Sequence, residues 1–284
     1  MGKQGKGATL EKKTPKIAIQ GYAGSFHQLA AQKRFGKQLD IVPCSNFREL
    51  VKKLETDISV DAAVMAIENS NAGSILPNYS LLQSAAVKIT GEIYLQIQQN
   101  LIVYPGVQLK DIREVHSHPI ALLQCSEYLD KQGWKIVETE DTALSVKHIA
   151  DHQLRHTAAV AGVVAASQYG MKLLKKNIQT DKANFTRFLF LQRGKTKYEE
   201  GNKASAFFEL SHQRGSLATV LGLIAEAGIN LSKIQSVPVP GIPWKYAFHA
   251  DLEFESSDIL FRVIRKIRNK TEKLMIYGIY ERGK

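Results

Sequence analysis

Apolar residues in the first two thirds of the chain follow two spacings that alternate along the sequence. Short apolar runs such as 17–19 predict strands, and segments with apolar residues three or four apart predict helices between them. Such alternation predicts an α/β fold, with helices on both faces of a sheet. The predicted strands are 16–20, 39–43, 61–67, 91–103, 113–116, 134–138, 157–160 and 185–192. The predicted helices are 25–35, 46–55, 77–84, 119–131, 142–152 and 161–170, with a short addition at 171–175.

The last third of the chain has a different order of elements. Strands are predicted at 204–210, 231–237, 244–254 and 273–280, and helices at 217–227 and 258–269. This βαββαβ order is typical of a ferredoxin-like unit. The polar, glycine-containing residues 194–203 predict a linker. We therefore expect one domain at 16–193 and a second at 204–284.

Composition narrows the class of protein. The 284-residue chain has a net charge of +11, to which the lysines of 1–15 contribute. The basic residues elsewhere are dispersed rather than gathered among aromatic residues, so we expect no nucleic-acid partner; a basic cleft would suit a dianionic substrate. No apolar run reaches 18 residues, so we expect no membrane partner. The Gly/Lys-rich residues 1–15 predict a disordered tail rather than a secretory signal. With only Cys44 and Cys125, the chain fits the reducing cytoplasm.

Polar residues interrupt the apolar pattern at three places where candidate strands begin or end. Residues 21–27, Gly-Tyr-Ala-Gly-Ser-Phe-His, join a strand to a helix, a geometry that exposes helix N–H groups to an anion. Residues 66–75, Ala-Ile-Glu-Asn-Ser-Asn-Ala-Gly-Ser-Ile, contain a run of polar or small residues at a strand's carboxyl end, which suits a ligand crevice. Residues 184–188, Asn-Phe-Thr-Arg-Phe, open a strand with polar groups that need partners or a ligand.

Together with Ser-His-Pro-Ile-Ala-Leu-Leu-Gln-Cys at 117–125, these strings stand in an order that resembles the prephenate dehydratase family. The resemblance covers 16–192. It implies a two-lobed catalytic domain like that of periplasmic binding proteins, with the cleft between the lobes. It also implies the decarboxylating dehydration of prephenate to phenylpyruvate in phenylalanine biosynthesis. Aromatisation drives this reaction, so we expect no cofactor and no metal.

The resemblance also implies roles for individual residues. Thr186 would donate a hydrogen bond or relay a proton to the departing hydroxide, and a buried Glu68 and the amide of Gln124 would assist it. Arg187 would bind a carboxylate and Phe188 would wall the ring, although strand alternation places Arg187 opposite Thr186. The predicted substrate-binding residues are Ser25, Asn69, Ser70, Ser74, Thr142, Arg187 and Phe188.

The C-terminal region resembles the ACT regulatory domain, which implies L-phenylalanine as allosteric effector and a homodimer or homotetramer. The predicted effector-binding residues are Gly215, Ser216, Leu217, Asn230, Gln235 and Ser236. The family's Glu-Ser-Arg-Pro segment is Gln-Ser-Val-Pro at 235–238, so the effector would bind more weakly or through other contacts. The alternative is a domain that serves only as a dimer clamp.

Two other functions remain open at this point. Arogenate dehydratase would perform the same chemistry on the amino-acid form of the substrate. A non-catalytic amino-acid sensor would keep both domains but leave Thr186, Glu68 and Gln124 without a role. The residues before Ile17 are too few for a chorismate mutase domain, so we expect a monofunctional enzyme of bacterial type.

Overall fold

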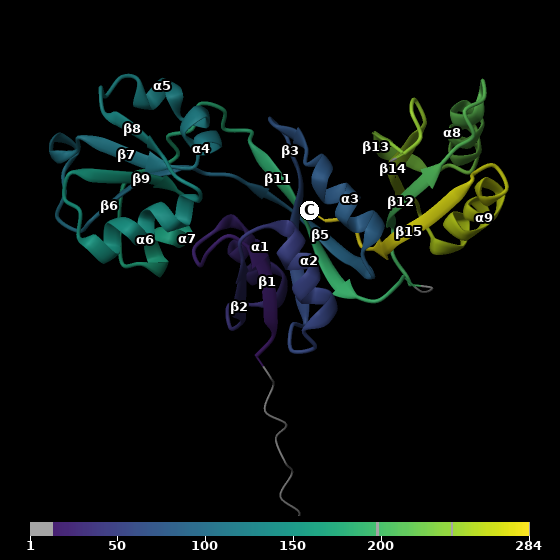
Figure 1. The fold of residues 1–284 in the computed structure, drawn as a ribbon, viewed down its shortest axis with the longest axis horizontal. Helices are drawn as coiled ribbons and strands as arrows, with labels where there is room; N and C mark the ends of the chain where they lie inside the picture. Colours follow the sequence, from purple (N-terminus) through teal and green to yellow (C-terminus); the bar gives the residue numbers. More distant parts are fainter. Residues whose placement is uncertain (1–13, 197–198, 240, 284) are drawn as a thin grey trace, which may run out of the picture.

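The computed structural model describes residues 14–196, 199–239 and 241–283, so all but the last two residues of the predicted tail lie outside it. Two α/β lobes and a C-terminal domain follow one another across the molecule, with the first lobe in the centre (Figure 1). The predicted fold class is confirmed. Within the described ranges, no helix is long and apolar enough to cross a membrane.

The first lobe is built on a sheet of strand order β2-β1-β3-β11-β5, with the short β4 paired to β3. Strands β1, β2 and β3 are parallel, and β11 runs antiparallel between β3 and β5. Helix α1 packs on one face of this sheet, and α2 and α3 pack on the other. The strands are β1 Lys16–Gln20, β2 Asp40–Cys44, β3 Ala62–Asn69, β4 Gly73–Ser74, β5 Val87–Gln96 and β11 Phe185–Arg193. The helices are α1 Phe26–Phe35, α2 Phe47–Thr56 and α3 Leu76–Ser84.

The second lobe has the strand order β10-β6-β9-β7-β8. Residues 97–99 lead into it and residues 176–184 lead back, so the chain crosses between the lobes twice. The strands are β6 Asn100–Val103, β7 Glu114–Ser117, β8 Lys135–Glu138, β9 Thr157–Ala161 and β10 Lys172–Lys175. The helices are η1 Leu109–Asp111, α4 Pro119–Gln124, α5 Ser126–Leu129, α6 Thr142–His152 and α7 Val163–Gln168.

Three sequence predictions fail at or near the crossings. The expected strand 91–103 is two strands in different sheets, because at 97–99 the backbone bonds to the returning segment: Ile97 N donates to the Asn184 carbonyl. The expected helix 119–131 is broken at Cys125 into α4 and α5. The segment 171–175 is the edge strand β10, because Gly170, with a φ of 64°, ends the preceding helical segment.

The C-terminal domain has the predicted βαββαβ order, with strand order β13-β14-β12-β15. Helices α8 and α9 cover one face of its sheet, and the other face packs on the first lobe against α3 and β5. A Cβ on Gly278 would lie 2.0 Å from the Ile89 carbonyl oxygen, so this packing requires glycine. The elements are β12 Lys203–Glu209, α8 Ser216–Glu226, β13 Asn230–Pro238, β14 Tyr246–Glu253, α9 Ser257–Arg268 and β15 Lys273–Tyr280.

Candidate active site

Asn69 and Thr186 face each other at the edge of the first-lobe sheet that borders the crossings. Asn69 ends β3 and Thr186 lies at the start of β11, so the antiparallel register pairs them. The Asn69 Nδ2 donates to Thr186 Oγ1 at 2.9 Å and to Asn184 Oδ1 at 2.6 Å. Among the described residues, none accepts the Thr186 hydroxyl proton. Because that hydroxyl already accepts from Asn69, its proton is free to be donated to a ligand.

The loop after β3 is tied to the same strand. Asn69 Oδ1 accepts from the backbone N–H groups of residues 71 and 72 at 3.0 and 2.9 Å. Ser70 Oγ accepts from Phe185 N at 2.9 Å and donates to the Ala183 carbonyl at 3.2 Å. Ser70 therefore holds the returning crossing against the loop, and its hydroxyl is already occupied by protein partners.

An open pocket of about 450 Å³ lies beside this pair, between the loop after β3 and the second lobe. Its lining includes Gln124 at the end of α4 and Asn184, the same residue that accepts from Asn69. Gln124 Oε1 accepts from Gln99 Nε2 at 3.4 Å, and the other amide oxygen, Gln99 Oε1, is buried without a partner. The structure thus brings Gln124 to the pocket that Asn184, the hydrogen-bond partner of Asn69, also lines.

Two helix N-termini meet where the lobes touch. Ser25 caps α1, with Oγ accepting from Gln28 N at 3.4 Å, and Asp141 caps α6, with Oδ1 accepting from Leu144 N at 2.9 Å. The Asp141 carboxylate lies against the loop that follows β1, since a Cβ on Gly21 would be 2.8 Å from its Oδ2. Burial raises the pKa of Asp141. Thr142 is the first residue of α6, so it is placed at this junction.

The lobes are in direct contact at this junction. The Tyr22 hydroxyl donates to Glu140 Oε1 at 3.0 Å, and the Tyr169 hydroxyl donates to the Ala23 carbonyl at 2.8 Å. A Cβ on Gly24 would lie 2.8 Å from the Ala165 Cα, so glycine is required there. The predicted strand–glycine–helix loop is therefore closed against the second lobe.

Arg187 does not contact the cleft, and its predicted role as a carboxylate ligand is wrong for this conformation. Strand alternation turns it to the face opposite Thr186, where 4% of the residue is exposed. Its Nε donates to Glu92 Oε2 at 2.7 Å, its Nη1 pairs with Asp251, and its Nη2 donates to the Tyr280 hydroxyl at 3.1 Å. The guanidinium is fully engaged between the first lobe and the C-terminal domain.

Glu68 and Ser74 also point at the C-terminal domain. Lys233 Nζ lies 2.5 Å from Glu68 Oε1 and donates to Ser74 Oγ at 2.8 Å. The expected proton-donating role of Glu68 is therefore not supported, because its carboxylate is paired on the face away from Thr186. Phe188 is 1% exposed and meets the His27 ring edge-on at a centroid distance of 5.0 Å. It packs the core beneath α1 instead of walling the cleft.

The predicted effector residues divide into two groups. Ser216 and Leu217 line an open pocket of about 740 Å³ at the start of α8, and Gly215 precedes them with a φ of 82°. Asn230, Gln235 and Ser236 lie on β13 and are not part of that lining. Asn230 Nδ2 donates to Glu253 Oε2 at 3.3 Å, and Gln235 Nε2 donates to the Ser236 carbonyl at 2.9 Å. One copy of the chain does not bring the two groups into one pocket.

Comparison with known families identifies the family to which this chain belongs. The family model for prephenate dehydratase matches residues 17–196. The chain belongs to the prephenate dehydratase family. The matched region is a prephenate dehydratase domain, and the enzymes of this family are lyases. It coincides with the two lobes and with all the residues of the cleft described above.

Individual relatives of this prephenate dehydratase family member support the assignment. An arogenate dehydratase/prephenate dehydratase of Arabidopsis thaliana is 35% identical over 277 residues, covering 93% of this chain and 72% of the relative. The chain spans 65% to 75% of the length of the curated relatives it matches.

Solved structures share the whole architecture. A structure described as a quorum-quenching acylase is 28% identical, with a TM-score of 0.85, covering 94% of this chain and 98% of its own. A prephenate dehydratase of Arthrobacter aurescens in complex with L-Phe is 24% identical, with a TM-score of 0.83, and shows the same fold over 94% of this chain and 90% of its own.

Three polar residues of this dehydratase cleft were missed by sequence reasoning. Asn184 stands in the Asn-Phe-Thr-Arg-Phe string but reads as a turn residue, and Gln99 lies in the crossing that was predicted as strand. Asp141 precedes a predicted helix, so it reads as an ordinary cap. For Asn184 and Asp141 the available signal was position, because each directly precedes a predicted strand or helix; Gln99 falls inside the predicted strand 91–103, where nothing local marks it.

Proposed function

We propose that this chain converts prephenate to phenylpyruvate with Thr186 as the donor to the departing hydroxide. The observation that carries this proposal is the Asn69–Thr186 hydrogen bond, which orients the hydroxyl and leaves its proton free at the cleft. Loss of carbon dioxide and hydroxide creates an aromatic ring, so the protein has to orient the substrate and stabilise the leaving group. Help of this kind contributes about 10²–10⁴-fold.

The rest of the cleft supplies orientation. The amides of Gln124 and Asn184 line one pocket and can hold the substrate's carbonyl or hydroxyl oxygens. The N-termini of α1 and α6, capped by Ser25 and Asp141, carry partial positive charge that favours the substrate's carboxylates. Burial raises the pKa of Asp141, so this carboxyl ionises less readily beside an anionic substrate than an exposed one would. Thr142 lies at the same helix start and is proposed to contact the substrate there.

Arogenate is the second candidate substrate, and Asp141 is the observation that favours it. Arogenate carries an ammonium group on the side chain where prephenate carries a ketone. A carboxylate buried where the two lobes meet would pair with that ammonium. The Arabidopsis relative is named for both activities. Under this alternative Asp141 pairs with the substrate's ammonium group; under the first it serves as the N-cap of α6.

We further propose that the C-terminal domain is an ACT regulatory domain that binds L-phenylalanine. The ferredoxin-like topology and the pocket at Ser216 and Leu217 support this, and the Arthrobacter enzyme of the same fold was solved with L-Phe. Strand β13 is a sheet edge on which Ile234 is 40% exposed. An exposed edge of this kind tends to pair with another chain, which supports a homodimer or homotetramer.

The proposed location is the cytoplasm. Cys44 and Cys125 are both buried and unpaired, which fits a reducing compartment.

The test is turnover by the purified full-length chain. We expect phenylpyruvate to accumulate from prephenate, and its absorbance measures the rate. This rate is then compared with the rate of phenylalanine formation from arogenate at the same substrate concentration. Asp141→Asn separates the two substrates: a selective loss of arogenate turnover identifies the ammonium partner, and an equal effect on both favours the capping role. Binding of either compound without turnover would contradict the proposed activity and favour a sensor.

A further inference from the structure

The neighbours of Asn69 and Thr186 along their strands both point at the C-terminal domain. Glu68 and Arg187 are register partners on β3 and β11, one step from the Asn69–Thr186 pair. Side chains alternate across a sheet, so the cleft pair and its neighbours occupy opposite faces of the same two strands. Whatever holds Glu68 and Arg187 also fixes the backbone that presents Asn69 and Thr186.

Lys233 of the C-terminal domain contacts Glu68 of β3. Its Nζ lies 2.5 Å from Glu68 Oε1 and 2.8 Å from Ser74 Oγ, so one ammonium bridges β3 and β4. Lys233 lies on β13 at a shift in the β13–β14 register. It is a partly buried contact from the strand that also carries the predicted effector residues Gln235 and Ser236.

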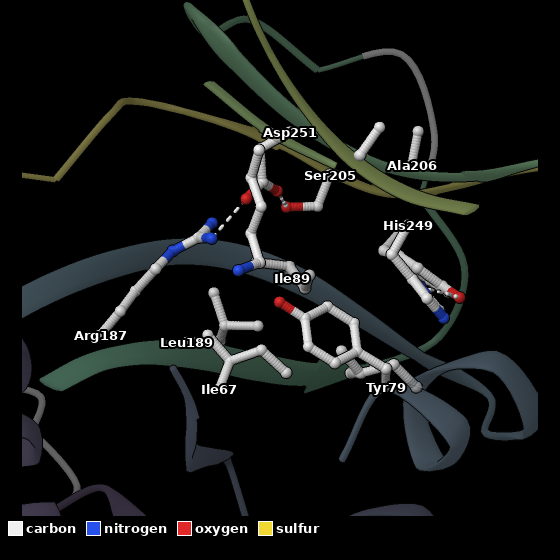
Figure 2. Close-up of a pocket in the computed structure, with 13 residues that line it drawn as sticks. Ile67, Tyr79, Ile89, Arg187, Leu189, Ser205, Ala206, His249 and Asp251 are labelled. Atoms are coloured by element: carbon white, nitrogen blue, oxygen red, sulfur yellow. Dashed lines mark hydrogen bonds and ion pairs between the residues drawn. The ribbon is translucent and has the colours of Figure 1, made fainter. Parts of the chain in front are cut away.

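Asp251, on β14, contacts Arg187 of β11. It pairs with Arg187 Nη1 and accepts from Ser205 Oγ at 2.6 Å, as Figure 2 shows. Glu92 binds the other edge of the guanidinium and also accepts from Lys203 Nζ at 2.9 Å. Two buried carboxylates thus balance two buried cations across the domain boundary. Breaking such a buried set is costly because it leaves an uncompensated charge.

The strand pair is irregular at this place. The β3–β11 register shifts between Arg187 and Phe188, so Ile67 forms a bulge. A bulge interrupts the ladder and bends the strand. Beyond the bulge β11 keeps its register with β5, and the contacts of Glu68 and Arg187 add support from the C-terminal domain to the end of β3 and the start of β11.

We propose that Lys233 and Asp251 of the C-terminal domain are positioning residues for the dehydratase reaction. They hold Glu68 and Arg187 from behind, so that Asn69 and Thr186 keep their hydrogen bond and the Thr186 proton stays directed at the cleft. The reaction itself rests on the function proposed above. If the contacts serve only to dock the domains, their loss lowers stability and leaves the folded enzyme's kcat unchanged.

The experiment uses the full chain without phenylalanine and four variants. Lys233→Met and Asp251→Asn each remove one charge, and Lys233→Arg retains it. Lys88→Met is the matched control, because Lys88 also forms an ion pair, with Glu199 of the linker before the C-terminal domain, but lies on β5 opposite Gln192, six residues along β11 from Thr186. Each variant is measured for kcat and KM with the better substrate, for thermal unfolding, and for the ¹³C-methyl NMR signal of Thr186, assigned with Thr186→Val.

We expect Lys233→Met and Asp251→Asn to lower kcat about tenfold while KM changes less than about twofold. Their Thr186 methyl signal should shift, Lys233→Arg should recover most of the rate, and Lys88→Met should keep the parental rate and signal. If Lys233→Met has the parental kcat, or if its Thr186 methyl signal does not shift, the proposal is overturned. This holds for any result with Asp251→Asn. If the parental chain turns over neither substrate, the proposed function fails, and the methyl signal alone still decides the positioning role.

Discussion

The two faces of the β3–β11 strand pair differ in how fully the polar groups of their side chains are hydrogen-bonded within the protein. On the cleft face, Asn69 supports the Thr186 hydroxyl but leaves its proton unused. On the other face, the Arg187 guanidinium binds Glu92, Asp251 and Tyr280, and only 4% of the residue is exposed. Residues adjacent in one motif therefore serve different purposes: unsatisfied groups await a ligand, and satisfied groups join domains.

The same contrast explains why a positively charged residue in this motif is not a substrate ligand. A guanidinium that binds a carboxylate from solvent has to be reachable, and Arg187 is surrounded by protein partners of opposite charge. Although burial disfavours the charged form, the neighbouring Asp251 and Glu92 keep the pKa of Arg187 well above its usual value. Carboxylate recognition in the cleft falls instead to helix N-termini and amides.

The largest expected effect is on the domain-joining face. Glu92→Gln should lower the free energy of unfolding by about 3–5 kcal/mol, because Arg187 would keep only Asp251 and Lys203 only the partly exposed Glu253 as ion-pair partners. Urea unfolding followed by circular dichroism measures this. Exposed Glu127→Gln serves as the control with parental stability. A Glu92→Gln protein as stable as the parent would show that the buried charges are not coupled.

A slightly smaller effect is expected on the cleft face. Thr186→Val keeps the shape and branching of the side chain but removes its hydroxyl, so kcat should fall about 10²–10³-fold, or about 2.7–4 kcal/mol, as for a lost oxyanion donor. Thr186→Ser keeps a hydroxyl and should retain most of the rate. Steady-state kinetics on folded protein measure both. Equal rates for Thr186→Val and the parent would remove Thr186 from the mechanism.

Phenylalanine tests whether the C-terminal domain communicates with the cleft. A ligand that distinguishes two states shifts their balance by its differential affinity, typically about 1–3 kcal/mol, so we expect a 5- to 150-fold change in prephenate affinity. Activity and size-exclusion chromatography are measured together during a phenylalanine titration. A monomer would contradict the proposed oligomer. An oligomer whose activity does not change with phenylalanine would indicate that the domain serves only to hold the subunits together.

The smallest expected effect concerns Asp141. Its raised pKa means that the folded state binds its proton more tightly than the unfolded state does. This contribution to stability is fully present below the unfolded pKa and is lost as pH rises through the folded value. Asp141→Asn keeps the helix cap and should therefore gain stability relative to the parent as pH rises above about 4, the unfolded value. A melting-temperature difference that is independent of pH would contradict the assignment.

Much of the fold could be predicted because spacing alone distinguishes strands from helices over most of the chain. The prediction failed where distant partners decide the structure. Ile97 continues the apolar–polar alternation of Leu95 and Gln96, which predicts a strand, but the backbone of 97–99 bonds to the returning crossing, which is some 80 residues away in sequence. Residues 171–175 are short and ambiguous until they pair with β6.

The candidate site could be predicted from the sequence only on the face of the β3–β11 strand pair that carries Asn69 and Thr186. Asn69, Gln124 and Thr186 could be named because they stand in the ordered motifs that resemble the family, whereas polar side chains at strand and helix ends are in general ordinary caps. Alternation already placed Arg187 opposite Thr186, but its partner Asp251 lies 64 residues later and nothing local points to it. The same holds for Glu68, whose partner Lys233 is 165 residues away.

The most direct test of the two-face account is the KM for prephenate of folded Arg187→Gln. The account predicts a lower kcat, because the support behind Thr186 is weakened, and a KM within about twofold of the parent, because the guanidinium does not meet the substrate. A KM raised about a hundredfold with kcat preserved would contradict it, since that result would place the substrate carboxylate on Arg187.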